Sequence, residues 1–116
     1  MSDTQISVVI PMYNSEDCVS ELVKRLTEVL DNLGRIYEII LVNDCSPDNS
    51  WNKVIELCKA YDNLKGINLR RNFGQDCAIM AGLNNSSGEY VIIMDDDLQH
   101  DPKDTVIRKG RNLESQ

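Results

Sequence analysis

A run of acidic residues near the end of the chain has the composition of a metal site. Asp95, Asp96 and Asp97 follow a short apolar stretch, and Gln99 comes two residues later. In an extended chain, residues two apart project to the same side, so Asp95 and Asp97 can converge on one point. Mg²⁺ and Mn²⁺ prefer such oxygen ligands. The spacing predicts a Mg²⁺ or Mn²⁺ site at Asp95, Asp97 and Gln99; the alternative is a solvated acidic loop or the cap of a helix that Pro102 would begin.

Other polar and aromatic residues follow two of the apolar stretches and would share the edge of the protein with this acidic run. Pro11 closes the first stretch, Tyr13 comes two residues later, and Asp44 ends the second stretch. The Tyr ring could pack against a flat ligand. Neither G-x-G-x-x-G nor G-x-x-x-x-G-K-[ST] occurs, so a diphosphate bound here would depend on the metal rather than on a glycine-rich loop. His100 is interpreted as a bystander beside the carboxylates.

The elements that must position these residues alternate along the chain. Apolar, β-branched runs predict strands at 6–11, 37–44, 65–70 and 90–95, and apolar residues at helical spacing predict helices at 18–33, 51–61 and 75–84. Three of the runs are nearly continuous, which is typical of parallel strands covered on both faces. We therefore expect an open parallel sheet of order 3-2-1-4 with helices on both faces and a ligand crevice between the first and fourth strands.

Length and composition limit the class of protein. A chain of 116 residues with a net charge of -7 forms one domain or part of one and is a poor partner for nucleic acid or an anionic membrane. The start of the chain has no basic leader, and no run approaches the ~20 apolar residues of a membrane span, so we expect a cytoplasmic protein. Residues 1–104 are expected to form the domain, and the polar residues 105–116 a frayed tail.

Four stretches of the sequence resemble a known family when they are taken together. The stretches "SVVIPMYNSED", "YEIILVNDCSPDNS", "LRRNFGQDCAIMAGL" and "GEYVIIMDDDLQHDP" resemble, in order, the inverting family 2 glycosyltransferases of GT-A fold. The resemblance is strongest to the enzymes that transfer sugars to polyprenyl phosphates, such as dolichol-phosphate mannosyltransferase. It implies a Rossmann-like, mostly parallel sheet and a nucleotide-diphospho-sugar donor, either a UDP-sugar or a GDP-sugar.

The resemblance also implies roles for individual residues. The nucleotide-binding residues it suggests are Pro11, Tyr13, Asp44, Arg70, Arg71, Asp95 and Asp96. The metal ligands it suggests are again Asp95, Asp97 and Gln99, with Mg²⁺ or Mn²⁺ as the ion. Asp96 occupies the variable middle position of the acidic motif, so its extra charge is interpreted as incidental.

The sequence departs from the family pattern at several positions. Ser15 stands where many relatives have Glu, although Glu16 beside it could compensate, and Asn43 and Cys45 replace residues of the common patterns V-D-D-G-S and V-D-D-N-S. Relatives also continue well past the acidic motif, so the resemblance implies that these residues are a donor-binding half. The catalytic base is then expected beyond residue 116.

The expected partners follow from the same resemblance. The acceptor would be a lipid phosphate or a glycan. Relatives often act at the cytoplasmic face of a membrane. Apolar sheet surface left uncovered would favour homo-oligomers. Two other interpretations stay open: a module that binds nucleotide and metal without transferring anything, and a signalling receiver domain. Receivers place acidic residues after the first strand and a phosphorylated Asp after the third, whereas these positions here read "PMYNS" and "RRNFG".

Overall fold

The computed structural model describes residues 4–94 and 105–108, and the elements are numbered in chain order. The elements are β1 (Ile6–Met12), α1 (Val19–Leu33), β2 (Tyr37–Asn43), α2 (Ser50–Ala60), β3 (Leu64–Asn68), α3 (Gln75–Asn84), β4 (Tyr90–Ile93) and β5 (Thr105–Arg108). Within the described ranges, no helix combines the length and the apolar character needed to cross a lipid bilayer.

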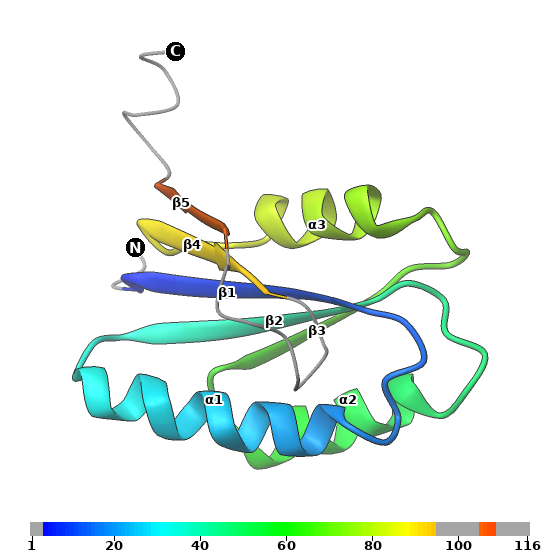
Figure 1. Cartoon of the computed structure of the whole chain (residues 1–116), viewed down its shortest axis with the longest axis horizontal. Helices are drawn as coiled ribbons and strands as arrows, with labels where there is room; N and C mark the ends of the chain where they lie inside the picture. The colour runs from blue at the N-terminus through cyan, green and yellow to red at the C-terminus, as the bar shows by residue number, and fades with distance from the viewer. Residues whose placement is uncertain (1–3, 95–104, 109–116) are drawn as a thin grey trace.

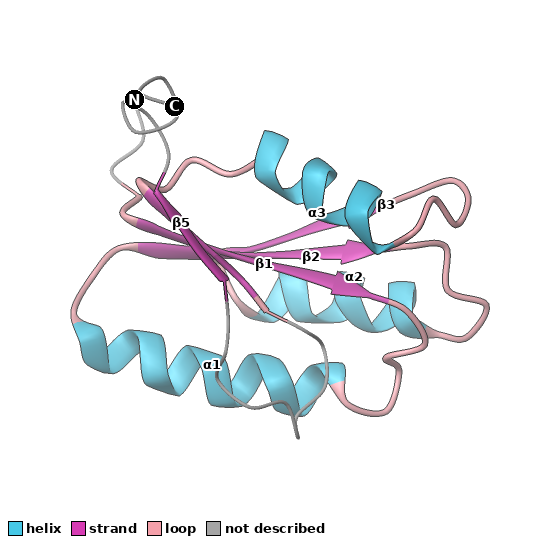
Figure 2. Ribbon diagram, turned by 45° about the horizontal axis from the view of Figure 1, so that its top comes forward, coloured by secondary structure: helices cyan, strands magenta, loops and turns pink. Residues whose placement is uncertain are grey.

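One sheet contains the strands of the described residues, in the order β3-β2-β1-β4-β5 (Figure 1). The first four strands are parallel, and the order 3-2-1-4 predicted from the sequence is confirmed. β1 and β2 pair along their whole length, from Ile6 opposite Tyr37 to Met12 opposite Asn43. The predicted arrangement of helices on both faces is also confirmed, with α1 and α2 on one side of the sheet and α3 on the other (Figure 2).

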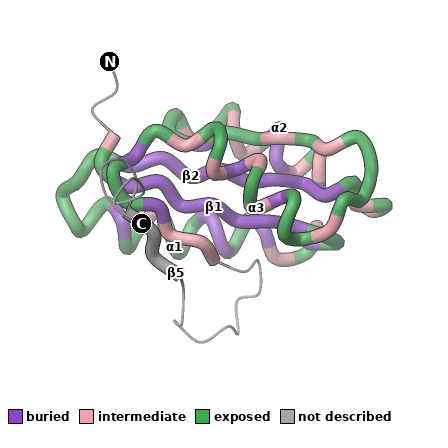
Figure 3. Tube along the Cα trace, turned by 90° about the horizontal axis from the view of Figure 1, so that it is seen from above, coloured by how far each residue is buried: buried purple, intermediate pink, exposed green. Residues whose placement is uncertain are grey.

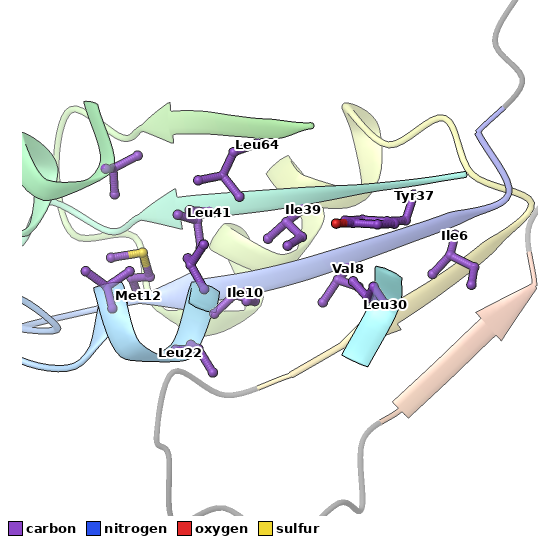
Figure 4. Packing of buried hydrophobic residues seen from close by; sticks show 13 residues of the cluster. Ile6, Val8, Ile10, Met12, Leu22, Leu30, Tyr37, Ile39, Leu41 and Leu64 are labelled. Carbon is purple, nitrogen blue, oxygen red and sulfur yellow. The ribbon is translucent and has the colours of Figure 1, made fainter. Parts of the chain in front are cut away.

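The two faces of the sheet are packed into separate apolar clusters. Alternate residues of β1, such as Val8 and Ile10, face α1 and α2 in the larger cluster (Figure 4). Val9 lies in the smaller cluster with Ala78 of α3. Every residue of β1 and β2 is buried, which explains their continuous apolar sequences (Figure 3).

Close approach of α3 to the sheet depends on a glycine. A Cβ atom at Gly82 would collide with the side chain of Val9 on β1. The helix therefore lies nearer to β1 and β2 than any larger residue at this position would allow. This contact fixes the position of α3, whose first turn lies at the carboxyl end of the sheet.

The fifth strand corrects the prediction made for the end of the chain. Residues 105–116 are predicted to be a frayed tail, but Thr105–Arg108 forms β5 and pairs antiparallel with β4. The prediction is wrong for these four residues because β5 is defined by its pairing with β4 rather than by its own short sequence. The rest of the predicted tail lies outside the described residues.

A buried carboxylate ties the amino-terminal end of the sheet together. Glu38 of β2 is 5% exposed and accepts hydrogen bonds from the Ser7 hydroxyl at 2.5 Å and from the Ser87 backbone N–H at 2.7 Å. The ammonium group of Lys65 on β3 lies 2.7 Å from its other oxygen. Ser7 Oγ in turn accepts the Gly88 N–H at 2.8 Å. One carboxylate thus links β1, β2, β3 and the loop before β4.

This network makes stability depend on pH in a defined direction. Burial raises the pKa of Glu38, but hydrogen bonds from Lys65, Ser7 and the Ser87 backbone outweigh burial and lower the pKa below its usual value of 4.5. A carboxyl whose pKa is lower in the folded state contributes stability above its unfolded pKa. That contribution is lost as the pH falls through the folded-state pKa.

We predict that Glu38→Gln lowers the free energy of unfolding at neutral pH by roughly 1.5–3 kcal/mol, because charged hydrogen bonds are lost. The difference between parent and variant should shrink as the pH falls below 4.5 and through the lower folded-state pKa of Glu38. Urea titrations at several pH values measure it. Glu56→Gln, at an exposed position of α2, is the matched control. If the difference in free energy of unfolding between the parent and Glu38→Gln stayed constant with pH, the ionised Glu38 carboxylate would not be the source of this stability.

Candidate functional site

The carboxyl ends of the parallel strands meet at one edge, here called the rim. Backbone hydrogen bonds continue past the strand ends: Asp44 N donates to Met12 O at 3.0 Å, and Leu69 N donates to Asn43 O at 2.9 Å. Met94 N, directly after β4, donates to Val9 O at 3.0 Å. The loops at 13–18, 44–49 and 69–74 therefore leave the sheet side by side, as the sequence predicts.

Asp44 is the buried acid of the rim. Its side chain is 5% exposed, and both carboxylate oxygens accept backbone hydrogen bonds, Oδ1 from Phe73 N at 2.9 Å and Oδ2 from Gly74 N at 3.1 Å. Gly74 has a φ of 96°, a conformation that favours glycine, and α3 begins at the next residue. Asp44 thus holds the turn from β3 into α3 against the end of β2.

Short polar side chains connect the loops after β1, β2 and β3. Ser46 Oγ donates to Asn43 Oδ1 at 2.6 Å and accepts the Asn14 N–H at 3.0 Å. Asn43 Nδ2 then donates to Asn68 Oδ1 at 3.0 Å. Asn43, which departs from the family pattern, therefore serves as a link between the ends of β2 and β3.

A second set of hydrogen bonds joins the start of α1 to the start of α2. Ser15 N donates to Ser50 Oγ at 2.9 Å, and Asn49 N donates to Glu16 Oε1 at 3.1 Å. Asp48 accepts from the Ser50 hydroxyl at 2.6 Å and from Glu16 N at 3.3 Å. Burial raises the pKa of Asp48, but the hydrogen bonds from Ser50 and Glu16 outweigh burial and lower it. Glu16 is thus engaged in joining the two loops.

Both loops turn through residues with unusual backbone conformations. Asn14 and Cys45 each have a φ of 55°, in the left-handed region that few residues other than glycine adopt. Each lies two residues beyond the end of its strand, β1 and β2 respectively. Each of the two loops thus has one left-handed residue at the same distance from the end of its strand.

The predicted nucleotide-binding residues of the described chain lie at or next to the rim. Tyr13 is 46% exposed directly beyond β1, and Asp44 is buried beside it. Arg70 and Arg71 are exposed in the loop after β3. Pro11 is buried inside β1, and its predicted contact with a nucleotide stays a prediction.

The predicted metal site lies outside the described residues. Asp95, Asp96, Asp97 and Gln99 follow Met94 in the sequence but are not among the residues that the structure describes, and neither is His100. Within residues 4–94 and 105–108, no group of three or more His, Cys, Asp or Glu side chains could hold a metal. The donor set of the acidic stretch contains only oxygen, which is the chemistry that Mg²⁺ and Mn²⁺ favour.

Sequence reasoning missed one exposed aromatic residue of the rim. Phe73 is 51% exposed, and the guanidinium carbon of Arg71 lies 5.7 Å from the centre of its ring. The available signal was a single aromatic in the otherwise polar stretch "RRNFGQD". Trp51, near the start of α2, is partly buried and packs against the larger apolar cluster. A groove of about 590 Å³ between α2 and β3 is lined by Trp51 and contains none of the rim residues.

The four parallel strands in this order, with helices on both faces, match the fold of the GT-A glycosyltransferases. The sequence matches glycosyl transferase family 2 over residues 7–107, so the chain belongs to this family. The predicted fold class and the predicted membership of family 2 are thereby confirmed, and the inverting mechanism and the polyprenyl-phosphate acceptor stay predictions.

Solved structures with the same fold come from longer proteins. The crystal structure of S. aureus TarS 1-349 is 30% identical, with a TM-score of 0.66 over 81% of this chain and 28% of that one. It has also been solved with UDP and with UDP-GlcNAc. A mannosyltransferase from Pyrobaculum calidifontis, in complex with GDP-Man and Mn²⁺, is 22% identical, with a TM-score of 0.70 over 84% of this chain and 28% of that one.

A third structure extends the same fold similarity. The glucosyl-3-phosphoglycerate synthase of Mycobacterium tuberculosis, in complex with Mn²⁺, UDP and phosphoglyceric acid, is 22% identical. Its TM-score is 0.63 over 81% of this chain and 33% of that one. The present chain thus spans 28–33% of the length of these three chains, and 17% of the longer TarS chain that has also been solved.

We predict that Asp44→Asn loosens the turn before α3, because an amide offers one acceptor oxygen where the carboxylate offers two. Hydrogen exchange at the Phe73 and Gly74 amides should accelerate by roughly tenfold or more, since a hydrogen bond to a charged group contributes about 1.5–3 kcal/mol. Exchange in the middle of β1 should not change. The control is Asp62→Asn, at an exposed position before β3. Unaltered exchange at both amides in Asp44→Asn would show that the Asp44 carboxylate does not hold this turn.

Proposed function

We propose that this chain is the donor-binding half of a metal-dependent, inverting glycosyltransferase that uses a nucleotide-diphospho-sugar. One observation carries the proposal: the strands of a family 2 chain bring Tyr13 and Asp44 to a single rim, and β4 leads toward the acidic stretch from the same rim. Met94 is hydrogen-bonded to β1 at this edge, and Asp95 is the next residue in the sequence.

In this proposal the rim residues bind the nucleoside. Tyr13 offers a half-exposed aromatic ring, and Asp44 offers the remaining lone pairs of its carboxylate to a base or ribose. The UDP, UDP-GlcNAc and GDP-Man complexes of structurally similar proteins support a nucleotide-sugar as the donor. Either a uracil or a guanine nucleotide is compatible with the motifs.

Asp95, Asp97 and Gln99 are the residues we propose to hold Mg²⁺ or Mn²⁺. When bound, the ion would neutralise the charge that develops on the leaving nucleoside diphosphate. The described chain contains no glycine-rich phosphate loop, so this ion would be the main contact to the diphosphate. The Mn²⁺ present in two of the similar structures supports this assignment.

The acceptor we propose is a polyprenyl phosphate. This part of the proposal rests on the sequence resemblance alone. A second candidate function is a module that binds nucleotide and metal without transferring a sugar. The 116 residues cover only 28% of the TarS 1-349 chain, and this small coverage favours the second function for the isolated chain.

We predict that Mn²⁺ strengthens the binding of UDP or GDP and that Asp97→Ala abolishes this effect, because the variant lacks one of the paired carboxylates. Isothermal calorimetry with Mn²⁺ and with a chelator measures both affinities. Asp62→Ala, an exposed acid at the opposite end of the sheet, is the control and should behave as the parent. If the parent bound UDP or GDP equally well in Mn²⁺ and in chelator, the proposal that a metal ion links the acidic residues to the diphosphate would be wrong.

We also predict that the 116-residue chain binds donor but transfers no measurable sugar to polyprenyl phosphate. General acid–base catalysis alone typically supplies a factor of roughly 10²–10⁴, and we place the catalytic base beyond residue 116. A radiolabelled transfer assay tests this, with nucleotide binding measured on the same preparation. Robust transfer by these residues would show that the base lies within them.

A further inference from the structure

The outer edge of β3 exposes backbone hydrogen-bonding groups. Among the described strands, β3 is the last on one side of the sheet and pairs with β2 alone (Figure 1). Leu69 N, directly after β3, donates to Asn43 O of β2 at 2.9 Å. The backbone groups of successive residues point to opposite sides of a strand, so those of Gly66 and Asn68 point away from β2. Both residues are exposed, and their N–H and C=O groups are therefore available to a further strand.

An apolar groove lies beside the same edge. The groove of about 590 Å³ is lined by, among others, Trp51 and Ile55 of α2 and Gly66 and Ile67 of β3. The Ile55 side chain is 38% exposed. A Cβ atom at Gly66 would collide with Val54, so no side chain projects there toward α2. Strand addition uses this combination of open backbone groups and neighbouring apolar contacts, and the surface therefore fits an extended strand.

The charged residue of β3 is engaged within its own chain. Edge strands are commonly protected from further pairing by exposed charged side chains, especially lysine. In β3 this residue is Lys65, and its ammonium group lies 2.7 Å from the Glu38 carboxylate of β2. Its charge is balanced before any second strand arrives. The edge is thus less protected than it would be by an unpaired lysine.

A second copy of β3 fits this edge in antiparallel orientation, with Ile67 on a two-fold axis. In that register Gly66 lies opposite the second copy's Asn68, and each donates its N–H to the carbonyl of the other. The axis repeats this pair of bonds and brings the two Ile67 side chains together. An axis through Gly66 would instead need the Leu64 N–H, which already donates to Tyr61 O at 3.4 Å. The available donors therefore favour the register centred on Ile67.

The charges at the two ends of β3 favour the same orientation. Asp62 precedes the strand and Arg70 follows it, and both are exposed. Antiparallel pairing brings the acidic start of each strand beside the basic end of the other, whereas parallel pairing would place like charges together. Exposed ion pairs contribute little affinity, so these charges set the direction of pairing rather than its strength.

We propose that this chain forms a two-fold symmetric dimer in which β3 pairs antiparallel with β3 of a second copy. The two sheets then become one continuous sheet, with Ile67 at its centre and Ile55 beside the joint. Because the strands of the two copies run in opposite directions, the two rims lie at opposite ends of the joined sheet. The inference does not depend on the proposed function, since it uses no donor contact.

The first test removes one outward-pointing N–H and leaves the pairing with β2 intact. Asn68→Pro lacks this donor, while the control Asn68→Ala keeps it and loses the same side chain. Sedimentation equilibrium over a range of concentrations should show a dimer for the parent and for Asn68→Ala. Asn68→Pro should raise the dissociation constant roughly tenfold or more, because symmetry removes the bond twice. Far-ultraviolet circular dichroism checks that each variant is folded.

The second test reports the register and does not require the proline variant to fold. Facing residues of a non-hydrogen-bonded antiparallel pair are close enough for a disulfide, so Ile67→Cys should cross-link to itself on oxidation. Peptide mapping by mass spectrometry distinguishes this bond from those of the four native cysteines. The control is Met80→Cys, at a 54% exposed position of α3, which should form no such dimer.

Three results would each overturn the inference. The first is a parent chain that stays monomeric at every concentration, which would leave the edge to a strand of a different protein. The second is a folded Asn68→Pro that dimerises as tightly as the parent. The third is a dimer of Ile67→Cys without the disulfide between the two introduced cysteines, which would place the interface elsewhere.

Discussion

Burial of β1 on every side is the constraint on which the rest of the structure depends. The strand pairs with β2 along one edge and β4 along the other, and its two faces contact different apolar clusters. A strand in this position needs apolar side chains throughout and helices above and below it. Its carboxyl end also lies between the ends of its neighbours, so the packing that stabilises the sheet creates the rim as well.

The central elements could be predicted from the sequence because their own residues specify them. The runs that became β1, β2 and β4 are apolar on both faces, and a parallel order requires the helices that connect them. The edge strand β3 was predicted at 65–70 but covers Leu64–Asn68, since its exposed residues carry a weaker pattern. β5 could not be recognised because four residues in a polar segment become a strand only through β4.

The candidate site was predictable in its location and in some residues but not in its internal contacts. Tyr13 and Asp44 could be placed at the rim because each follows a recognisable strand. The dual hydrogen bonding of Asp44 and the links made by Ser46 and Ser50 join loops about thirty residues apart. Such contacts depend on how the loops fold together, and no local spacing in the sequence reports them. The acidic stretch at 95–99 stays a prediction from sequence.

The left-handed backbone at Cys45 has a consequence for how this position can change in evolution. This conformation costs a residue with a side chain roughly 1–2 kcal/mol of conformational free energy, whereas it costs glycine little. This difference explains why glycine occupies the corresponding position of the family pattern V-D-D-G-S noted above. It also means that cysteine is held here by the surrounding loop, against its own preference. Related sequences are therefore expected to have glycine or asparagine at position 45 more often than cysteine, and to have no β-branched residue there.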